Sequence, residues 1–276
     1  MHIESGARSD VGRVRKNNED SFRAEPSLEL FVLSDGMGGQ ASGEVASALA
    51  VETVVEHCRA AAQDNGDAPD FCGELTPGLS DRTNRLASAI RLANRKIFEA
   101  GATDPARKGM GATIVSFWIT DRRLSLAHVG DSRAYLLRTG SFEQLTADHS
   151  LVADLVRGGI LTPQQAEVSE QQSILTRALG TQSSVEVDAD EQMLLAGDVL
   201  LLCSDGLSRT VTNPEIASTL ETHPDPQKAA DRLIDLANEN GGEDNVTAIV
   251  VRVTPEPKGF LARWRRSRPK RSSGKK

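Results

Sequence analysis

Cysteine is scarce in this sequence, which has three cysteines among its 276 residues: Cys58, Cys72 and Cys203. An odd number of cysteines without a CxxC spacing matches neither a disulfide framework nor a zinc knuckle. The five histidines are scattered and include no HxxxH pair. A metal site built from nitrogen and sulfur ligands is therefore not indicated, and we interpret the cysteines as small buried apolar residues.

Long hydrophobic runs are also missing. The longest stretch without a charged residue has twelve residues, from Gly109 to Thr120, whereas a membrane-spanning helix needs about 20 apolar residues. The first ten residues carry charges at Glu4, Arg8 and Asp10 and contain no apolar core. They do not match a secretory signal, and we therefore expect a cytoplasmic protein.

Nucleotide-binding motifs and internal repeats are absent too. No GxGxxG follows a strand-like run, and residues 36–39 lack the lysine of a phosphate-binding loop. These absences disfavour a doubly wound nucleotide-binding fold. No segment repeats with a period of about 20 to 50 residues, which excludes a solenoid or a propeller.

The charge is unevenly distributed along the chain. Residues 258–276 hold nine of the 32 basic residues and no acidic one, so the rest of the chain has 23 basic against 39 acidic residues and a net charge of −16. Such an acidic body repels nucleic acid on average, and we expect no specific nucleic-acid partner. Its acidity is easier to explain if some of the carboxylates hold cations.

Strand-like and helix-like segments follow one another in a pattern typical of an α+β protein. Six short apolar runs predict strands at 30–34, 112–119, 123–129, 133–138, 199–204 and 246–253. Several are separated by too few residues for a parallel crossover, so antiparallel pairing is expected. Helices are predicted over 42–62 and 81–100, and after potential N-caps at Thr162, Asn213 and Asp225, each followed by a proline.

Carboxylates stand at the ends of predicted strands. The aspartates at strand ends, and an acidic pair nearer the N-terminus, are Asp35, Asp131, Asp205, Asp244 and Glu19-Asp20. Carboxylates of neighbouring strand ends converge in space and repel one another unless cations lie between them. Oxygen ligands select hard ions such as Mg²⁺ or Mn²⁺, and two such ions can activate a water for attack on phosphorus. The pattern predicts hydrolysis of a phosphate ester.

In this order, the motifs resemble the protein phosphatase 2C family of metal-dependent serine/threonine phosphatases. The matching segments are SDVGRVRKNNEDSF, FVLSDGMGGQASGEVAS, GMGATIV, LAHVGDSRAYLLR, LTADHS, LTRALG, LLLCSDGLSRTV and GGEDNVTAIVV. The resemblance implies one metal-dependent phosphatase domain over residues 1–257. The implied fold is a four-layer α/β/β/α sandwich, with two central antiparallel sheets flanked by helices.

The resemblance also implies two metal ions, Mn²⁺ or Mg²⁺, in the core of the site. The first ion would be held by Asp35, Asp205 and Asp244. The second would be held by Asp35, the backbone carbonyl of Gly36 and Glu19, the last partly through water. Asp35 would thus bridge the two ions.

Further residues receive implied roles around these ions. Asp131 together with Asp205 would form a third, weaker metal site of the kind seen in bacterial-type members. Arg15 would bind the substrate phosphate, and Asp20 would support the metal-bound waters. Eukaryotic members have a histidine, a proposed general acid, where this chain has Met37, so the leaving alkoxide is expected to take its proton from metal-bound water. His149 is interpreted as a packing histidine.

The implied reaction is direct attack of a metal-bridging hydroxide on phosphoserine or phosphothreonine in proteins, without a phosphoenzyme. The expected substrates include a bacterial serine/threonine kinase, whose action the enzyme would reverse, and a monomer is expected. Two alternatives stay open: a catalytically weak module of the same fold that binds phosphoproteins, and a phosphodiesterase or nuclease using the same carboxylates. The complete carboxylate set argues against the first, and the acidic body argues against the second.

Two segments lie outside this core. Residues 150–174 correspond to the family's flap beside the site and are expected to tune substrate choice more than chemistry. Residues 258–276 are predicted to form a basic, disordered tail, in which Phe260, Leu261 and Trp264 could share one face of a short helix. The tail is compatible with a solubilising role, with contact to the chain's own acidic body, or with binding to an acidic partner or to the anionic inner face of a membrane.

Overall fold

The computed structural model describes residues 1–38, 42–63 and 70–255. Within them, the strands predicted from apolar runs form two antiparallel sheets. The strands at 114–120 and 123–129 pair directly across a short turn, as expected, whereas those at 123–129 and 133–138 lie in different sheets. The first sheet has the order β1 (His2–Asp10), β11 (Val246–Thr254), β10 (Val199–Cys203), β7 (Arg133–Arg138) and β8 (Ser141–Gln144). The second has the order β2 (Asp20–Glu25), β3 (Leu30–Met37), β5 (Ile114–Thr120), β6 (Arg123–Val129) and β9 (Asp188–Met193).

The predicted strand over 112–119 is divided in two. Its first part is the two-residue β4 (Gly111–Ala112), which pairs with the end of β3, and β5 begins after Thr113. Thr113 leaves the ladder because it is bonded to Asp35: its N–H donates to the Asp35 carbonyl at 2.8 Å, and its hydroxyl accepts from the Asp35 N–H at 3.0 Å. The interruption therefore fixes the backbone of one of the predicted site residues.

The two sheets pack face to face around an apolar core. Phe31 and Phe117 of the second sheet meet Leu200, Leu202 and Ile249 of the first, and all five side chains are fully buried. Alternating inward-facing residues of both sheets fill this space, as in other β-sandwiches. This inner layer holds the strand ends of the two sheets in fixed relation to each other.

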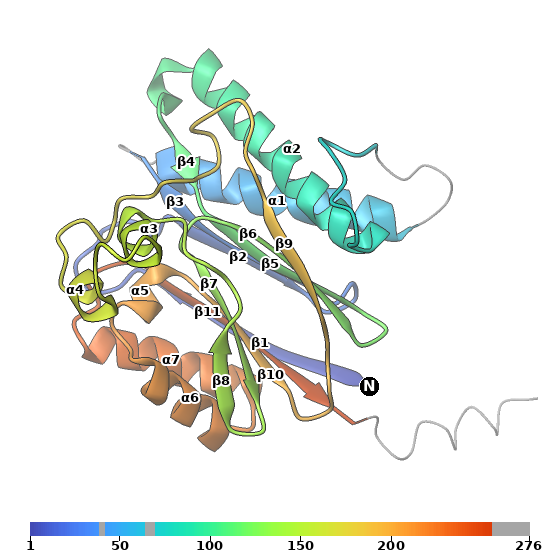
Figure 1. The fold of residues 1–276 in the computed structure, drawn as a ribbon, viewed down its shortest axis with the longest axis vertical. Helices are drawn as coiled ribbons and strands as arrows, with labels where there is room; N and C mark the ends of the chain where they lie inside the picture. The colour runs from blue at the N-terminus through green and yellow to red at the C-terminus, as the bar shows by residue number, and fades with distance from the viewer. Residues whose placement is uncertain (39–41, 64–69, 256–276) are drawn as a thin grey trace, which may run out of the picture.

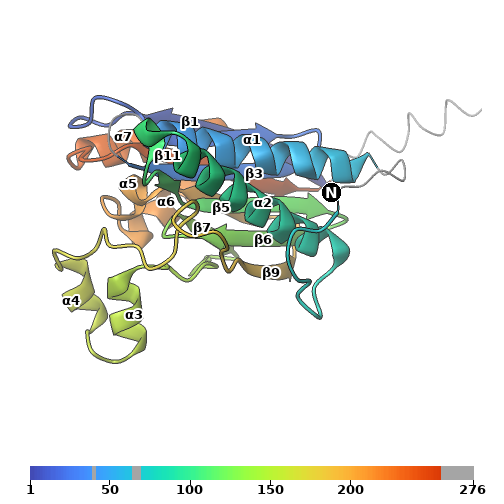
Figure 2. The same ribbon diagram turned by 90° about the horizontal axis from the view of Figure 1, so that it is seen from above.

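Helices cover the outer face of each sheet (Figures 1 and 2). The second sheet is covered by α1 (Ser42–Ala62) and α2 (Asp81–Thr103), which is followed by the 3-10 helix η1 (Pro105–Arg107); the first is covered by α5 (Asp205–Ser208), α6 (Asn213–Thr222) and α7 (Pro226–Glu239). The expected four-layer α/β/β/α sandwich is confirmed. Figure 2 shows the short helices α3 (Leu151–Arg157) and α4 (Pro163–Glu167) standing beside the layers.

Two of the three predicted N-caps are confirmed, and one is wrong. Thr162 caps α4 and Asp225 caps α7, but the N-cap of α6 is Thr212 rather than Asn213. Glu215 explains the difference, because its carboxylate accepts hydrogen bonds from the N–H and the hydroxyl of Thr212 at 2.9 and 2.7 Å. This T-x-x-E arrangement starts the helix one residue earlier.

Within the described part of the chain, no helix is both long enough and apolar enough to cross a bilayer. The predicted basic tail, residues 258–276, lies outside the described residues, as does the predicted domain boundary at residue 257.

Candidate active site

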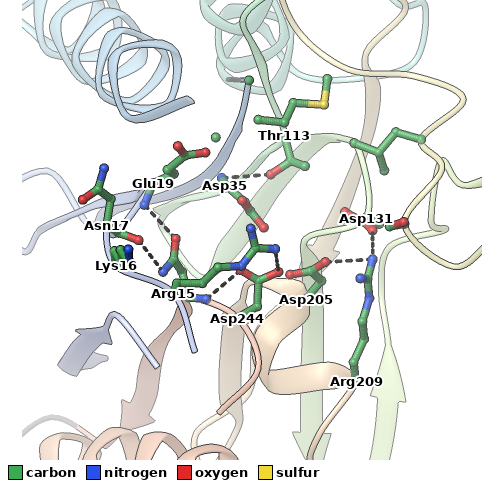
Figure 3. A pocket seen from close by; sticks show the side chains of 16 residues that line it. Arg15, Lys16, Asn17, Glu19, Asp35, Thr113, Asp131, Asp205, Arg209 and Asp244 are labelled. Carbon is green, nitrogen blue, oxygen red and sulfur yellow. Dashed lines mark hydrogen bonds and ion pairs between the residues drawn. The ribbon is translucent and has the colours of Figure 1, made fainter. Parts of the chain in front are cut away.

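A cavity of about 420 Å³ opens where β3, β6, β10 and β11 meet their connecting loops. Seven of the eight residues that the sequence singles out line this one cavity: Arg15, Glu19, Asp35, Gly36, Asp131, Asp205 and Asp244. Figure 3 shows the side chains of the six labelled residues among them, all but Gly36, gathered in one place from separate elements. The tertiary structure therefore gathers carboxylates that are up to 225 residues apart in the sequence, from Glu19 to Asp244.

The eighth residue, Asp20, lies beneath the cavity rather than in its wall. The β2–β3 register places it opposite Asp35, and its Oδ2 accepts hydrogen bonds from the hydroxyls of Ser204 and Thr247 at 2.8 and 2.6 Å. Burial raises the pKa of Asp20 to about 7; the two hydroxyls lower it and the nearby Asp205 raises it. Asp20 is thus held rigidly in contact with both sheets.

Asp205 begins α5 directly after β10, at a point where the backbone approaches β11 very closely. A Cβ on the neighbouring Gly206 would lie 2.0 Å from the Asn245 carbonyl oxygen. Only glycine allows this approach without a shift of the backbone. The glycine of the SDG motif therefore brings Asp205 next to Asp244.

Asn245 is a positioning residue that the sequence does not reveal. Its Oδ1 accepts the Glu19 N–H at 2.8 Å, and its Nδ2 donates to the carbonyls of Val11 and Asn17 at 3.0 and 2.9 Å. These bonds fasten the loop that carries Arg15 and Glu19 to the start of β11. Asn245 is the last residue of the GGEDN motif, but only the fold shows which groups its side-chain amide binds.

Arg15 lies at the mouth of the cavity (Figure 3). Its Nη2 donates to Asp244 Oδ2 at 2.8 Å, and its side chain is 56% exposed. A planar guanidinium that is both anchored and exposed can still bind a phosphate dianion.

The carboxylates fit a pair of hard divalent cations. Burial raises the pKa of Asp35 well above its usual value, and the charges of Asp20, Asp205, Asp131 and Asp244 raise it further. Among the described residues, Asp20 Oδ1 and Asp205 Oδ1 are buried without a hydrogen-bond partner. Buried, unpartnered oxygens that repel one another need positive charge, and all-oxygen donors suit Mg²⁺ or Mn²⁺.

An arginine side chain lies between the two residues expected to hold a third cation. Arg209 Nη2 lies 3.0 Å from Asp131 Oδ2 and 2.7 Å from Asp205 Oδ2, so a guanidinium joins these two carboxylates (Figure 3). Burial and Asp205 raise the pKa of Asp131 to about 7, whereas Arg209 lowers it. No motif in the sequence singles out Arg209, although its i,i+4 spacing from Asp205 is typical of a helical ion pair.

A second group of possible ligands lies outside this cavity. In the described part of the chain, His128, His149 and Asp188 bring ligand atoms within 4.8 Å of one another. However, His149 Nδ1 already accepts the Gly130 N–H at 3.1 Å, and the Arg177 guanidinium lies 2.5 Å from Asp188. The group is a hydrogen-bond network in which the buried His149 packs against the buried His128, with ring centroids 4.7 Å apart.

Comparison with known proteins agrees with this geometry. The family model described as protein phosphatase 2C matches residues 12–249. The serine/threonine protein phosphatase PstP of Mycobacterium tuberculosis is 41% identical over 251 residues, which are 91% of this chain and 45% of that protein. The serine/threonine phosphatase Stp of Listeria welshimeri is 36% identical over 91% of this chain and 95% of its own length. The chain thus spans about half the length of PstP and nearly all of Stp.

Solved structures show the same fold. The crystal structure of the catalytic domain of PstP in complex with two manganese ions matches 92% of this chain and 99% of that domain, with a TM-score of 0.76 and 40% identity. The sequence motifs, the two packed antiparallel sheets and the shared carboxylate cavity therefore lead to one assignment. The chain belongs to the protein phosphatase 2C family.

Proposed function

We propose that this protein is a metal-dependent serine/threonine protein phosphatase, which hydrolyses phosphoserine and phosphothreonine in proteins. The observation behind the proposal is that one cavity combines Glu19 and four aspartates with an arginine at its mouth. Family membership and the names of the relatives support the reaction class. The manganese ions in the PstP structure support the choice of cofactor.

Two divalent cations would be held by the oxygens in the floor of the cavity, with Asp35 between them. The proposed ligands are Asp35, Asp205 and Asp244 for one ion and Asp35, Glu19 and the Gly36 carbonyl for the other. Bound there, Mn²⁺ or Mg²⁺ supplies Lewis-acid charge and a water of lowered pKa for the attack on phosphorus.

The chain's own residues bind and position the substrate. Arg15 places its guanidinium over the cavity and would bind two phosphate oxygens at once, which fixes the orientation of the phosphorus atom. Asp20 is held by Ser204 and Thr247 beneath the cavity, and its other carboxylate oxygen, Oδ1, is buried without a hydrogen-bond partner. We propose that this oxygen would accept a hydrogen bond from water. Thr113 and Asn245 hold the backbones of Asp35 and Glu19.

Met37 lines the cavity and offers a thioether, which cannot donate a proton. The proposal therefore assigns no general acid to this position. Ser173 and Leu175 also line the cavity, which supports a role in substrate choice for residues 150–174 and their continuation.

The expected partners are phosphoproteins and, among them, a serine/threonine kinase whose action this protein reverses in the cytoplasm. We expect the catalytic unit to act as a monomer, because the proposed ligands all come from one chain. Attachment of the basic tail to an anionic membrane surface or an acidic partner stays a prediction. The alternative of a catalytically weak phosphoprotein-binding module has less support, because each carboxylate expected to bind a metal ion lines the cavity.

The proposal is tested by phosphate release from a phosphothreonine peptide with Mn²⁺, with Mg²⁺ and with EDTA. We expect release with either metal, none with EDTA, and a loss of at least about 100-fold in Asp205→Asn, because removing one ligand charge weakens cation binding. Asp190→Asn, an exposed aspartate of β9 outside the cavity, is the matched control. Folded wild-type protein that releases no phosphate under any metal would favour the binding module instead.

A further inference from the structure

Arg209 occupies the position where a third cation would lie. Its Nη2 donates to Asp131 Oδ2 at 3.0 Å and lies 2.7 Å from Asp205 Oδ2. The same nitrogen donates to the backbone carbonyl of Gln172 at 3.3 Å. One guanidinium nitrogen thus has oxygen neighbours on three different segments of the chain.

The local structure explains why Arg209 lies there. Asp205 begins the short helix α5 and Arg209 is its C-cap, whose N–H donates to the Asp205 carbonyl. This single turn places the side chains at i and i+4 on the same face. Because α5 follows β10 directly and packs against β11, the arginine side chain is directed over the Asp205 carboxylate toward Asp131.

The charges at this position are already compensated. The Asp131 side chain is 9% exposed and that of Asp205 is 13% exposed, so both carboxylates need nearby positive charge. Arg209, whose side chain is 31% exposed, supplies a charge that is present at every physiological pH. A divalent cation between the same oxygens would have to displace the guanidinium and would then lie beside its charge.

We propose that Arg209 takes the place of a third metal ion, so that this protein holds two divalent cations and its Asp131 is neutralised by an arginine of its own chain. This inference rests on the proposed two-cation site. The Arg209 guanidinium then links Asp131, Asp205 and the Gln172 carbonyl at any metal concentration. Its contact with Gln172, in the segment after α4, therefore does not depend on bound metal.

The experiment counts Mn²⁺ ions per chain by equilibrium dialysis of the folded, metal-stripped protein over a range of free Mn²⁺. We expect about two ions for the wild type even at millimolar Mn²⁺, and about three for Arg209→Ala, the additional one weakly bound. Arg157→Ala, which removes an exposed arginine of α3 on the same side of the molecule, is the matched control and should retain about two. Arg209→Lys should also retain about two, because it keeps a cation.

A double variant, Asp131→Asn with Arg209→Ala, tests whether the additional ion binds where the arginine was. It should return the count to about two, since one of the two carboxylates is neutral. If Arg209→Ala does not fold, Arg209→Gln keeps most of the stem without the charge and should give the same increase.

Two results would overturn the inference. One is a wild type that binds about three ions and loses one in Asp131→Asn; the other is an Arg209→Ala or Arg209→Gln variant that still binds about two. A wild type that binds no Mn²⁺ would instead overturn the proposed two-cation site, and the inference with it. The count therefore distinguishes the failure of the inference from the failure of the proposed function.

Discussion

Arg15 and Asp244 form an ion pair across the mouth of the cavity, with 2.8 Å between Nη2 and Oδ2. The residue proposed to bind phosphate is thus held by a residue proposed to bind metal. A cation on Asp244 would compete with Arg15 for the carboxylate and leave the guanidinium available for a phosphate dianion. Metal binding and substrate binding are therefore expected to favour each other at this pair.

The first prediction concerns Arg15. Arg15→Ala should lower kcat/KM for a phosphothreonine peptide about 10- to 100-fold, because a charge-assisted hydrogen bond contributes about 1.5–3 kcal/mol. Arg15→Lys should recover part of the loss, since an ammonium keeps the charge but not the bidentate geometry. Steady-state kinetics with Arg23→Ala, a β2 arginine outside the cavity, as control would check this. Equal kcat/KM in all four proteins would exclude Arg15 from phosphate binding.

The second prediction concerns the removal of metal. Cations that relieve the repulsion among buried carboxylates bind the folded state, so Mn²⁺ at about 100 times its Kd should add about 2.7 kcal/mol of stability. For a domain of this size that corresponds to a rise in Tm of about 5–10 °C. Thermal unfolding in EDTA and in Mn²⁺ would measure the shift, and Asp244→Asn should reduce it. A Tm that is the same in both buffers would contradict the proposed site.

The third prediction concerns Gly43 in the first turn of α1. A Cβ at this position would lie 2.2 Å from Glu19 Oε2 and 2.9 Å from the backbone carbon of Gly36. Gly43→Ala should therefore push the Glu19 carboxylate out of place and weaken the binding of one Mn²⁺ by about tenfold, equivalent to about 1.4 kcal/mol. Calorimetric titration would measure the affinity.

Gly101→Ala provides the matched control for Gly43→Ala. Gly101 lies in α2, where the nearest atom to a new Cβ would be 3.2 Å away, so its replacement should leave Mn²⁺ affinity unchanged. Similar affinities in both variants would mean that the close approach of Gly43 does not position Glu19.

The fourth prediction concerns Glu191, which fastens the N-terminus of α2 to β9. Its carboxylate accepts from the Ser80 N–H at 2.7 Å, from the Thr83 hydroxyl, and from Arg123 Nη1 at 2.7 Å. Burial would raise the pKa of Glu191, but the hydrogen bonds from Ser80 and Thr83 outweigh it, and the pKa falls to about 2. Glu191→Gln should therefore cost about 1–2 kcal/mol of unfolding free energy at pH 7.

The sign of the pH dependence follows from the lowered pKa. The ionised carboxylate stabilises the fold fully above its ordinary value of 4.5, and this contribution is lost as the pH falls toward about 2. The difference in unfolding free energy between wild type and Glu191→Gln, measured by urea unfolding, should shrink as the pH falls from about 4.5 toward 2. A difference that stays constant down to pH 3 would show that the ionisation of Glu191 contributes little.

The strands that could be predicted from the sequence are those marked by a continuous apolar run. The apolar runs at 30–34, 123–129 and 199–204 form strands buried in the sandwich. Of their pairings with other predicted strands, only that of 123–129 with 114–120 follows from a short connection; the rest join segments distant in sequence. The edge strands β1, β2, β8 and β9 were not singled out, because half-exposed segments such as SFEQ and DADEQM lack an apolar run. For these, pairing with a neighbouring strand decides the conformation.

The sequence by itself determined the layered α+β class and the set of acidic residues at strand ends, because side-chain periodicity and turn chemistry act over a few residues. The tertiary structure alone decided that Asp20 lies under the cavity and that Asn245 holds the loop of Glu19. It also decided that Arg209 lies between Asp131 and Asp205. These contacts join residues that are distant in sequence, and the packing of the two sheets, which no local pattern encodes, sets the distances between them.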